Sequence, residues 1–223
     1  MVTPDEARYG AIPAEMRSTG EWVAPRLNGI RYFEKPVMGY WMTAAAQSIF
    51  GDNAWAIRLP SALGMGFSAL CLVLFARRVK VWPEVGWLAA IAMLTMLGTV
   101  IGGTMATLDA MFTGALTGAI TFFYLAWTAR TRSAKIGWLV LFGGFCGLAF
   151  LIKGFLGLAI PTIVIAPFLV WLRRWRDIVL LPWIPMVVAA AVVAPWAIAV
   201  HLADGDFWHY FFWIEHVKRF TGG

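Results

Sequence analysis

Charged residues are scarce in this chain of 223 residues, where they make up 13% of the sequence while hydrophobic residues make up 61%. Soluble domains carry about a quarter charged and about half apolar residues. So much apolar surface cannot be hidden in a globule of 24.7 kDa, because a small domain still exposes a large share of its area. A soluble enzyme, a disordered chain and a disulfide-stapled secreted domain are therefore excluded, and the sequence predicts an integral membrane protein.

Cysteine and histidine are also rare, with two and three residues respectively. Cys71 and Cys146 lie inside apolar runs, where a cysteine behaves as a small hydrophobic residue and predicts no disulfide framework. His201, His209 and His216 all follow the last apolar run. Haem ligation inside a helical bundle is therefore not expected, and we expect no organic cofactor.

Six apolar runs have the length of membrane-spanning helices, about 17 to 25 residues. They predict three regions: an external loop over 1–56, six transmembrane helices within 57–200, and an external interfacial segment over 201–223. Within the flanking regions, amphipathic and aromatic patterns predict helices that lie on the membrane surface over 5–20, 36–50 and 206–220. The six predicted spans are 57–76, 84–102, 107–129, 136–152, 154–172 and 178–200.

The net charge of +6 does not indicate a nucleic-acid partner, because the basic residues are not gathered on one polar face. Nine of them crowd into the short loops after the first, third and fifth spans, which marks those loops as cytoplasmic. Both termini then face outside. The nine residues are Arg77, Arg78, Lys80, Arg130, Arg132, Lys135, Arg173, Arg174 and Arg176.

The first 56 residues are polar enough to need translocation, yet no signal peptide or earlier span precedes them in the sequence. We therefore expect that a preceding transmembrane helix is missing. The chain ends at Thr221-Gly222-Gly223, and we expect a cut there as well.

Single charges at the external end each have an ordinary structural explanation. Asp5 and Glu6 could simply cap a helix, and Glu34 beside Lys35 could be a minor interfacial ion pair. Lys153, in the tight turn between 136–152 and 154–172, could extend to the lipid headgroups. An acid at the edge of hydrocarbon needs a cation, a metal or a water-filled cavity, and Asp109 has no basic neighbour in sequence.

Taken together, these charges are more informative, because the topology places all of them on the external side. Carboxylates, cations and an imidazole at one end of a bundle predict a polar cavity in which cations hold a phosphate and aromatic rings contact a sugar or an isoprenoid chain. The expected reaction is group transfer from a lipid phosphate. Glu215 and His216 with Glu34 or Asp109 would also suit a divalent metal, although no short ligand spacing supports that site.

Several short motifs are spread over nearly the whole chain. They are Asp5-Glu6-Ala7-Arg8-Tyr9, Pro25-Arg26-Leu27-Asn28-Gly29, Tyr32-Phe33-Glu34-Lys35-Pro36, Arg58-Leu59-Pro60-Ser61, Leu108-Asp109, Lys153-Gly154, Ala194-Pro195-Trp196 and 211–220. In content and order they resemble the bacterial aminoarabinose transferases, which belong to a wider family of lipid-linked-sugar glycosyltransferases that includes the protein O-mannosyltransferases.

The resemblance implies an all-α integral membrane protein with the C-type glycosyltransferase helical bundle and interfacial helices in its first periplasmic loop. It implies an undecaprenyl phosphate-linked sugar as donor and lipid A as acceptor, at the periplasmic face of the bacterial inner membrane, and a role in polymyxin resistance. By the same resemblance Asp5 and Asp109 are the catalytic acids, and Glu34 and His216 hold a divalent metal, zinc or another. The donor phosphate would be held by Arg8, Lys35, Lys153 and Arg219.

The sequence leaves three alternatives open. The acceptor could be a protein hydroxyl, as in the mannosyltransferases, in which case Asp5 would act as general base. The chain could be an inactive fragment or an assembly subunit. A lipid transporter is the third alternative, but it would carry ionisable residues near the bilayer midplane, where this sequence has uncharged spans.

Overall fold

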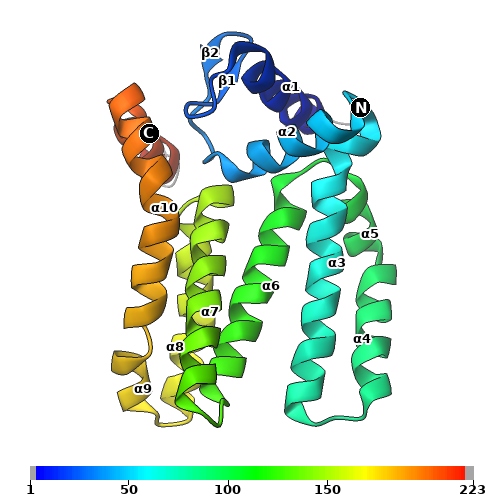
Figure 1. The fold of residues 1–223 in the computed structure, drawn as a ribbon, viewed down its shortest axis with the longest axis vertical. Helices are drawn as coiled ribbons and strands as arrows, with labels where there is room; N and C mark the ends of the chain where they lie inside the picture. The colour runs from blue at the N-terminus through cyan, green and yellow to red at the C-terminus, as the bar shows by residue number, and fades with distance from the viewer. Residues whose placement is uncertain (1–3, 219–223) are drawn as a thin grey trace.

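The computed structural model describes the backbone of residues 4–218 and the side chains of residues 6–213. It is a helical bundle with two helices and a short hairpin across one end (Figure 1). The elements are α1 (Pro4–Thr19), β1 (Arg26–Leu27), β2 (Ile30–Arg31), α2 (Met38–Phe50), α3 (Ala54–Val79), α4 (Pro83–Thr95), α5 (Leu97–Thr104), α6 (Leu108–Trp127), α7 (Arg132–Lys153), α8 (Leu156–Trp171), α9 (Trp175–Leu180), α10 (Trp183–Ala203) and the π-helix η1 (His209–Lys218).

Four segments of the described chain are long and apolar enough to cross a membrane: α3, α6, α7 and α9 with α10. A fifth span is formed if α4 and α5 count as one, although these two helices bend by 65° at Met96. Helix α8 is apolar but shorter. The protein is therefore a multi-pass membrane protein, and the predicted number of six spans remains a prediction.

The turns after α3, α6 and α8 lie at the end of the bundle away from α1 and α2 (Figure 1). These turns carry the nine basic residues that predict the cytoplasmic side. The described acidic and basic side chains of the predicted cavity, Arg8, Glu34, Lys35, Asp109 and Lys153, belong to the opposite end. The bundle thus separates the two groups of charges as the sequence predicts.

Small residues allow the central helices to approach closely, as is common between helices in membranes. A Cβ atom at Gly64 of α3 would lie 2.6 Å from the Ala110 carbonyl oxygen of α6, and one at Gly114 would lie 2.7 Å from the Gly64 oxygen. Likewise, a Cβ at Gly143 of α7 would lie 2.6 Å from the backbone of Pro185 in α10. These contacts bring α3, α6, α7 and α10 together by their backbones.

A two-residue hairpin, which the sequence analysis did not predict, precedes the Glu34-Lys35 motif. Asn28 and Gly29 both have positive φ, 55° and 77°, which suits the tight turn favoured by Asn-Gly. The Glu15 carboxylate of α1 accepts hydrogen bonds from both of their backbone N–H groups, at 2.8 and 2.9 Å. The hairpin is thereby fastened to α1 and delivers Tyr32 and the residues after it to the end of the bundle.

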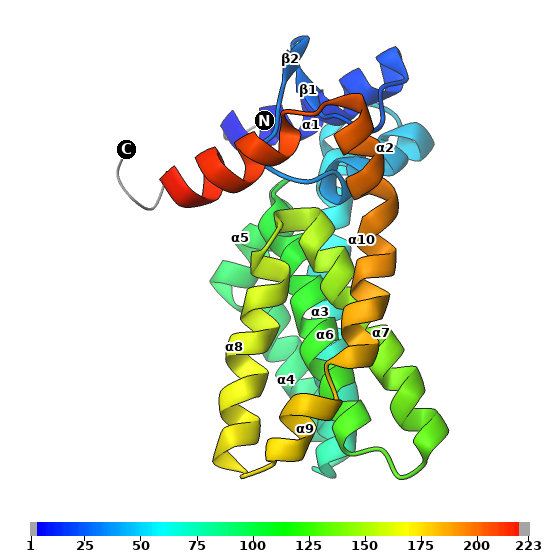
Figure 2. The same cartoon turned by 90° about the vertical axis from the view of Figure 1, so that its left-hand side faces the viewer.

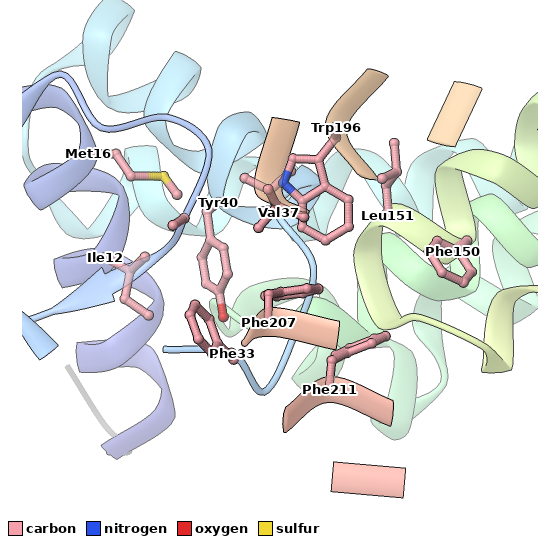
Figure 3. Packing of buried hydrophobic residues seen from close by; sticks show 12 residues of the cluster. Ile12, Met16, Phe33, Val37, Tyr40, Phe150, Leu151, Trp196, Phe207 and Phe211 are labelled. Carbon is pink, nitrogen blue, oxygen red and sulfur yellow. The ribbon is translucent and has the colours of Figure 1, made fainter. Parts of the chain in front are cut away.

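The helices at this end are joined by a cluster of buried apolar side chains (Figure 3). Tyr40 of α2 and Phe207, Phe211 and Trp196 from the C-terminal part of the chain are buried in it. The Trp196 indole N–H also donates to the Val23 carbonyl oxygen at 3.0 Å. The cluster therefore fixes α1, α2 and the segment after α10 to one another. Its other buried members are Ile12, Met16, Ala24, Phe33, Val37, Phe150, Leu151 and Val200.

The helices predicted over 5–20 and 36–50 occur as α1 and α2, with small shifts at their ends, while the third, over 206–220, ends outside the described residues. The first helix begins at Pro4, so that Asp5 lies inside its first turn rather than before it. The second begins at Met38, two residues after the proline that we expected to open it. Whether these helices lie on a membrane surface remains a prediction.

Candidate functional site

The first ionic group of the site connects α1 to the segment that follows the hairpin. The Arg8 guanidinium donates to the Tyr32 hydroxyl at 2.8 Å, and that hydroxyl donates to Glu34 Oε2 at 2.8 Å. Arg8 also lies 3.8 Å from the same carboxylate oxygen and 5.5 Å from the centre of the Tyr32 ring. The adjacent Lys35 Nζ donates to the Glu34 carbonyl oxygen at 2.9 Å. Two cations thus lie at Glu34, Arg8 at its carboxylate and Lys35 at its backbone carbonyl, and cations gathered in this way can hold an anion.

Burial of the Tyr32 phenol raises its pKa well above the usual value, and its hydrogen bond to Glu34 raises it further. The phenol therefore remains protonated through the neutral range and keeps donating to the carboxylate. Tyr40, which lies close to the same group, also has a raised pKa because of its burial. Its hydroxyl has no hydrogen-bond partner among the described residues.

Asp109 and Lys153 form the second ionic group, an ion pair between the start of α6 and the end of α7. The carboxylate of Asp109 is 72% exposed, whereas Lys153 is mostly covered and lies 5.6 Å from the centre of the Phe112 ring. Each charge that was difficult to explain from sequence thus has the other as its partner. The carboxylate also lies in the first turn of α6, where the helix dipole favours it.

The third ionic group connects the start of α1 to α3 and to the segment just before α6. Glu6 is fully buried, and its carboxylate accepts two hydrogen bonds from the Arg58 guanidinium of α3, at 2.8 and 3.1 Å. It accepts another from the Ala106 backbone N–H at 3.1 Å. Ala106 lies three residues before Asp109 in the chain, so this contact relates the first turn of α1 to the start of α6.

Tyr9 lies between the first two ionic groups. Its ring is 6.1 Å from that of Tyr40, and it packs against both the cluster around Phe33 and the cluster that contains Phe112. Arg8 belongs to the first ionic group. Tyr9, the next residue, packs against the cluster that contains Phe112, and Lys153 of the second ionic group lies over the Phe112 ring. The structure thus brings Arg8, Glu34, Lys35, Asp109 and Lys153 to the same end of the bundle.

Three of the predicted site residues lie partly or wholly outside the described residues. Asp5 is placed in the backbone of α1 and His216 in that of η1, but their side chains are not described, and Arg219 lies beyond the described chain. The segment that leads to His216 is anchored nearby, because Phe211 lies against Gly154. Gly154 has a φ of 73° and no room for a Cβ atom, since the Phe211 ring would lie 2.6 Å from it.

The predicted metal site can be tested only on Glu34. Its carboxylate accepts a hydrogen bond from Tyr32 and faces Arg8, so one oxygen is engaged within the protein. Among the described side chains, no group of three metal-ligating residues was found. A metal held by Glu34 and His216 therefore remains a prediction.

Comparison with known proteins indicates the family to which this arrangement of helices and charges belongs. The family model described as dolichyl-phosphate-mannose-protein mannosyltransferase matches residues 1–211. The chain belongs to this family. The resemblance seen in the motifs is thereby confirmed over almost the whole sequence.

Curated relatives give a more specific comparison. The undecaprenyl phosphate-alpha-4-amino-4-deoxy-L-arabinose arabinosyl transferase of Aeromonas salmonicida is 45% identical over 219 residues, which cover 98% of this chain and 40% of that protein. Its counterpart from Pseudomonas fluorescens, numbered 1, is 43% identical over 222 residues, with 99% and 39% coverage. The chain thus spans about two fifths of the length of the curated relatives it matches.

Solved structures of ArnT from Cupriavidus metallidurans show the same fold. The apo structure superimposes with a TM-score of 0.90 at 30% identity and covers 98% of this chain and 41% of that one. The structure bound to undecaprenyl phosphate gives 0.89 at 30% identity, with 98% and 40% coverage. The predicted fold class, a C-type glycosyltransferase bundle with helices across one end, is confirmed.

The sequence analysis missed the roles of three residues that organise the site: Glu6, Arg58 and Tyr32. It favoured a helix-capping role for Glu6, whereas the structure buries this side chain against Arg58. It treated Tyr32 only as an aromatic neighbour of Glu34, although its hydroxyl connects that carboxylate to Arg8. The quoted motifs contain all of these residues, but spacing alone did not indicate that they pair.

Proposed function

We propose that the protein is a membrane glycosyltransferase that moves aminoarabinose, or a related sugar, from undecaprenyl phosphate to a lipid A phosphate. The reaction would occur at the periplasmic face of the bacterial inner membrane. The observation that carries the proposal is the gathering of Arg8, Lys35 and Lys153 with the carboxylates of Glu34 and Asp109 at one end of the bundle. The fold shared with ArnT bound to undecaprenyl phosphate supports it.

In this proposal the cations bind and stabilise the lipid phosphate that leaves the sugar. Arginine and lysine form charge-assisted hydrogen bonds to phosphate oxygens. These hydrogen bonds would strengthen as negative charge builds on the leaving group. Arg8 contacts the carboxylate of Glu34 and Lys35 its backbone carbonyl oxygen, and Lys153 is the last residue of α7. Arg219 would complete this set, since it follows the anchored segment at Phe211.

The carboxylates would act on the acceptor. A lipid A phosphate is already anionic near neutral pH, so Asp5 and Asp109 would position it rather than deprotonate it. Attack of an acceptor oxygen on the anomeric carbon would form the new glycosidic bond and break the bond to the donor phosphate. Such a direct displacement inverts the anomeric centre. A divalent metal at Glu34 and His216, if bound, would neutralise charge beside this site.

Transfer of the sugar in liposomes tests the proposal. The protein is reconstituted with undecaprenyl phosphate–aminoarabinose and lipid A, and the mass of lipid A is followed. We expect Lys35→Ala and Asp5→Asn to lower transfer by about a hundredfold or more, as loss of an electrostatic contact or of a positioning group does. Lys135→Ala, at the other end of the bundle, is the matched control and should keep full activity. Transfer at the parent rate by both site variants would refute the assignment.

A hydroxyl acceptor is the second candidate, because the matching family model describes protein mannosyltransferases. In that case Asp5 would remove the proton from the attacking hydroxyl as a general base. The same liposomes with a serine- and threonine-containing peptide in place of lipid A separate the two candidates. Sugar on the peptide alone would favour the hydroxyl acceptor.

A further inference from the structure

An apolar cleft of about 370 Å³ lies between α8 and α10, far from the candidate site. Residues of α6, α7 and α9 complete its lining, and α9 lies at the lower end of the bundle, where it connects α8 to α10 (Figure 2). Among its described lining residues, Asp177 is the one charged side chain. Thr162 also lines it, but the hydroxyl of this residue already donates to the Leu158 carbonyl oxygen at 2.8 Å. The cleft thus offers apolar walls and suits a hydrocarbon chain.

A second hollow adjoins the cleft at the end of the bundle that the positive-inside rule marks as cytoplasmic. It is lined by Arg173, Arg174 and Arg176, by Trp175 and Leu180, and by Asp177, which also lines the cleft. All three arginines are exposed, and one of them, Arg174, lies 3.7 Å from the Asp177 carboxylate. Three guanidinium groups against one carboxylate leave a local net charge of +2.

Exposed tryptophans mark the depth of this hollow in the membrane. Trp171, Trp175 and Trp183 are all largely exposed and come from the end of α8, the start of α9 and the start of α10. Tryptophan prefers the boundary between headgroups and hydrocarbon. The arginines therefore lie at headgroup level, while the cleft extends from them towards the hydrocarbon.

We propose that the cleft and the hollow together bind one anionic glycerophospholipid of the cytoplasmic leaflet. Its phosphate would contact Arg173, Arg174 and Arg176, and one acyl chain would lie between α8 and α10. Basic pockets between transmembrane helices on this side bind anionic headgroups, and arginine forms bidentate contacts with phosphate. The site lies at the end of the bundle opposite the one proposed for the donor, and it does not depend on the proposed function.

Two other occupants compete with this proposal. The polyprenyl phosphate donor also joins a phosphate to a hydrocarbon chain. Because the curated relatives are more than twice as long as this chain, a helix of a longer protein could also cover the cleft. A protein helix would not need the charge of the arginines, whereas the polyprenyl phosphate would need it as a phospholipid does and is separated from a phospholipid by competition.

Native mass spectrometry of the detergent-solubilised chain tests the site. Phosphatidylglycerol and phosphatidylcholine with the same acyl chains are added separately, and the bound fraction is measured against concentration. We expect phosphatidylglycerol to bind at least about tenfold more tightly, given the charge near the headgroup. Equal affinities would overturn the proposal.

Three variants separate charge from shape. Replacing all three arginines by glutamine should remove the preference for phosphatidylglycerol. Replacing three basic residues in the turn after α6 removes the same charge elsewhere and should leave that preference intact. Ala166→Phe, which fills the cleft, should weaken both lipids. A preference that survives the first variant, unchanged binding of both lipids to the Ala166→Phe variant, or loss of the preference in the control would overturn the proposal. So would displacement of phosphatidylglycerol by equimolar undecaprenyl phosphate. The first variant is R173Q/R174Q/R176Q, and the control is R130Q/R132Q/K135Q.

Discussion

Replacing Glu6 by glutamine should destabilise the protein much more than its place in the first turn of a helix suggests. The carboxylate is fully buried and accepts three hydrogen bonds from described residues, two from Arg58 and one from the Ala106 N–H. Glutamine has the same length but only one acceptor oxygen. Its amide nitrogen would face one of these donors, so that at least one buried donor would lose its partner.

The size of the effect follows from this geometry. Removing one partner from a buried ion pair costs about 3–5 kcal/mol, and we expect the lower end, about 3 kcal/mol, because the other partner is one-third exposed. In a chain of 223 residues, 1 kcal/mol corresponds to about 2–4 °C in Tm. Glu6→Gln should therefore lower Tm by about 6–12 °C.

Thermal unfolding of the chain in lipid nanodiscs, followed by tryptophan fluorescence, measures this shift. Arg17→Gln is the matched control, because Arg17 pairs with Asp52 at 2.5 Å in an exposed position. Exposed pairs contribute about 0–1 kcal/mol, so the control should move Tm by at most about 4 °C. Equal shifts for the two variants would refute the view that burial of Glu6 makes its pair important.

Three further predictions concern the same end of the bundle. Tyr40→Phe should leave Tm unchanged or raise it, because the buried hydroxyl that it removes has no partner among the described residues; a fall in Tm would contradict this. Since the pKa of Tyr32 is raised in the folded state, the stability difference between the parent and Tyr32→Phe should stay constant up to about pH 10. Above that pH the parent should lose stability relative to the variant, as denaturant unfolding at each pH would show. Exchanging Asp109 and Lys153 in a double variant should restore part of the Tm lost by Asp109→Lys alone, and no recovery would show that their ion pair is not stabilising.

Much of the fold was predictable because the length of an apolar run and the basic residues of a loop are both local features of the sequence. The runs that became α3, α6 and α7 are long and apolar, and the turns after α3, α6 and α8 carry the expected cations. The bend at Met96 was not predictable in the same way. An apolar run that continues through 84–102 has the same composition whether or not its helix breaks.

The site was predictable as a set of charges on one side, but not as a set of pairs. Asp109 and Lys153 are 44 residues apart and Glu6 and Arg58 are 52 apart, so only the packing of α1, α3, α6 and α7 decides which of them meet. The hairpin was a local signal that we missed. Asn28-Gly29 is a strong turn sequence, but the two-residue strands beside it are too short to show alternation.

The hydrogen bonds between Glu15 and the hairpin tip limit how this end of the protein can move. Arg8 and Glu15 project from the same helix, and Tyr32 N–H donates to the Pro25 carbonyl oxygen at 2.8 Å to close the hairpin base. The helix, the hairpin and the segment with Glu34 are thus linked at several points. If this end of the protein shifts to admit a lipid, the arginine, the phenol and the carboxylate must travel as one rigid piece, and their mutual geometry would be the same before and after the movement.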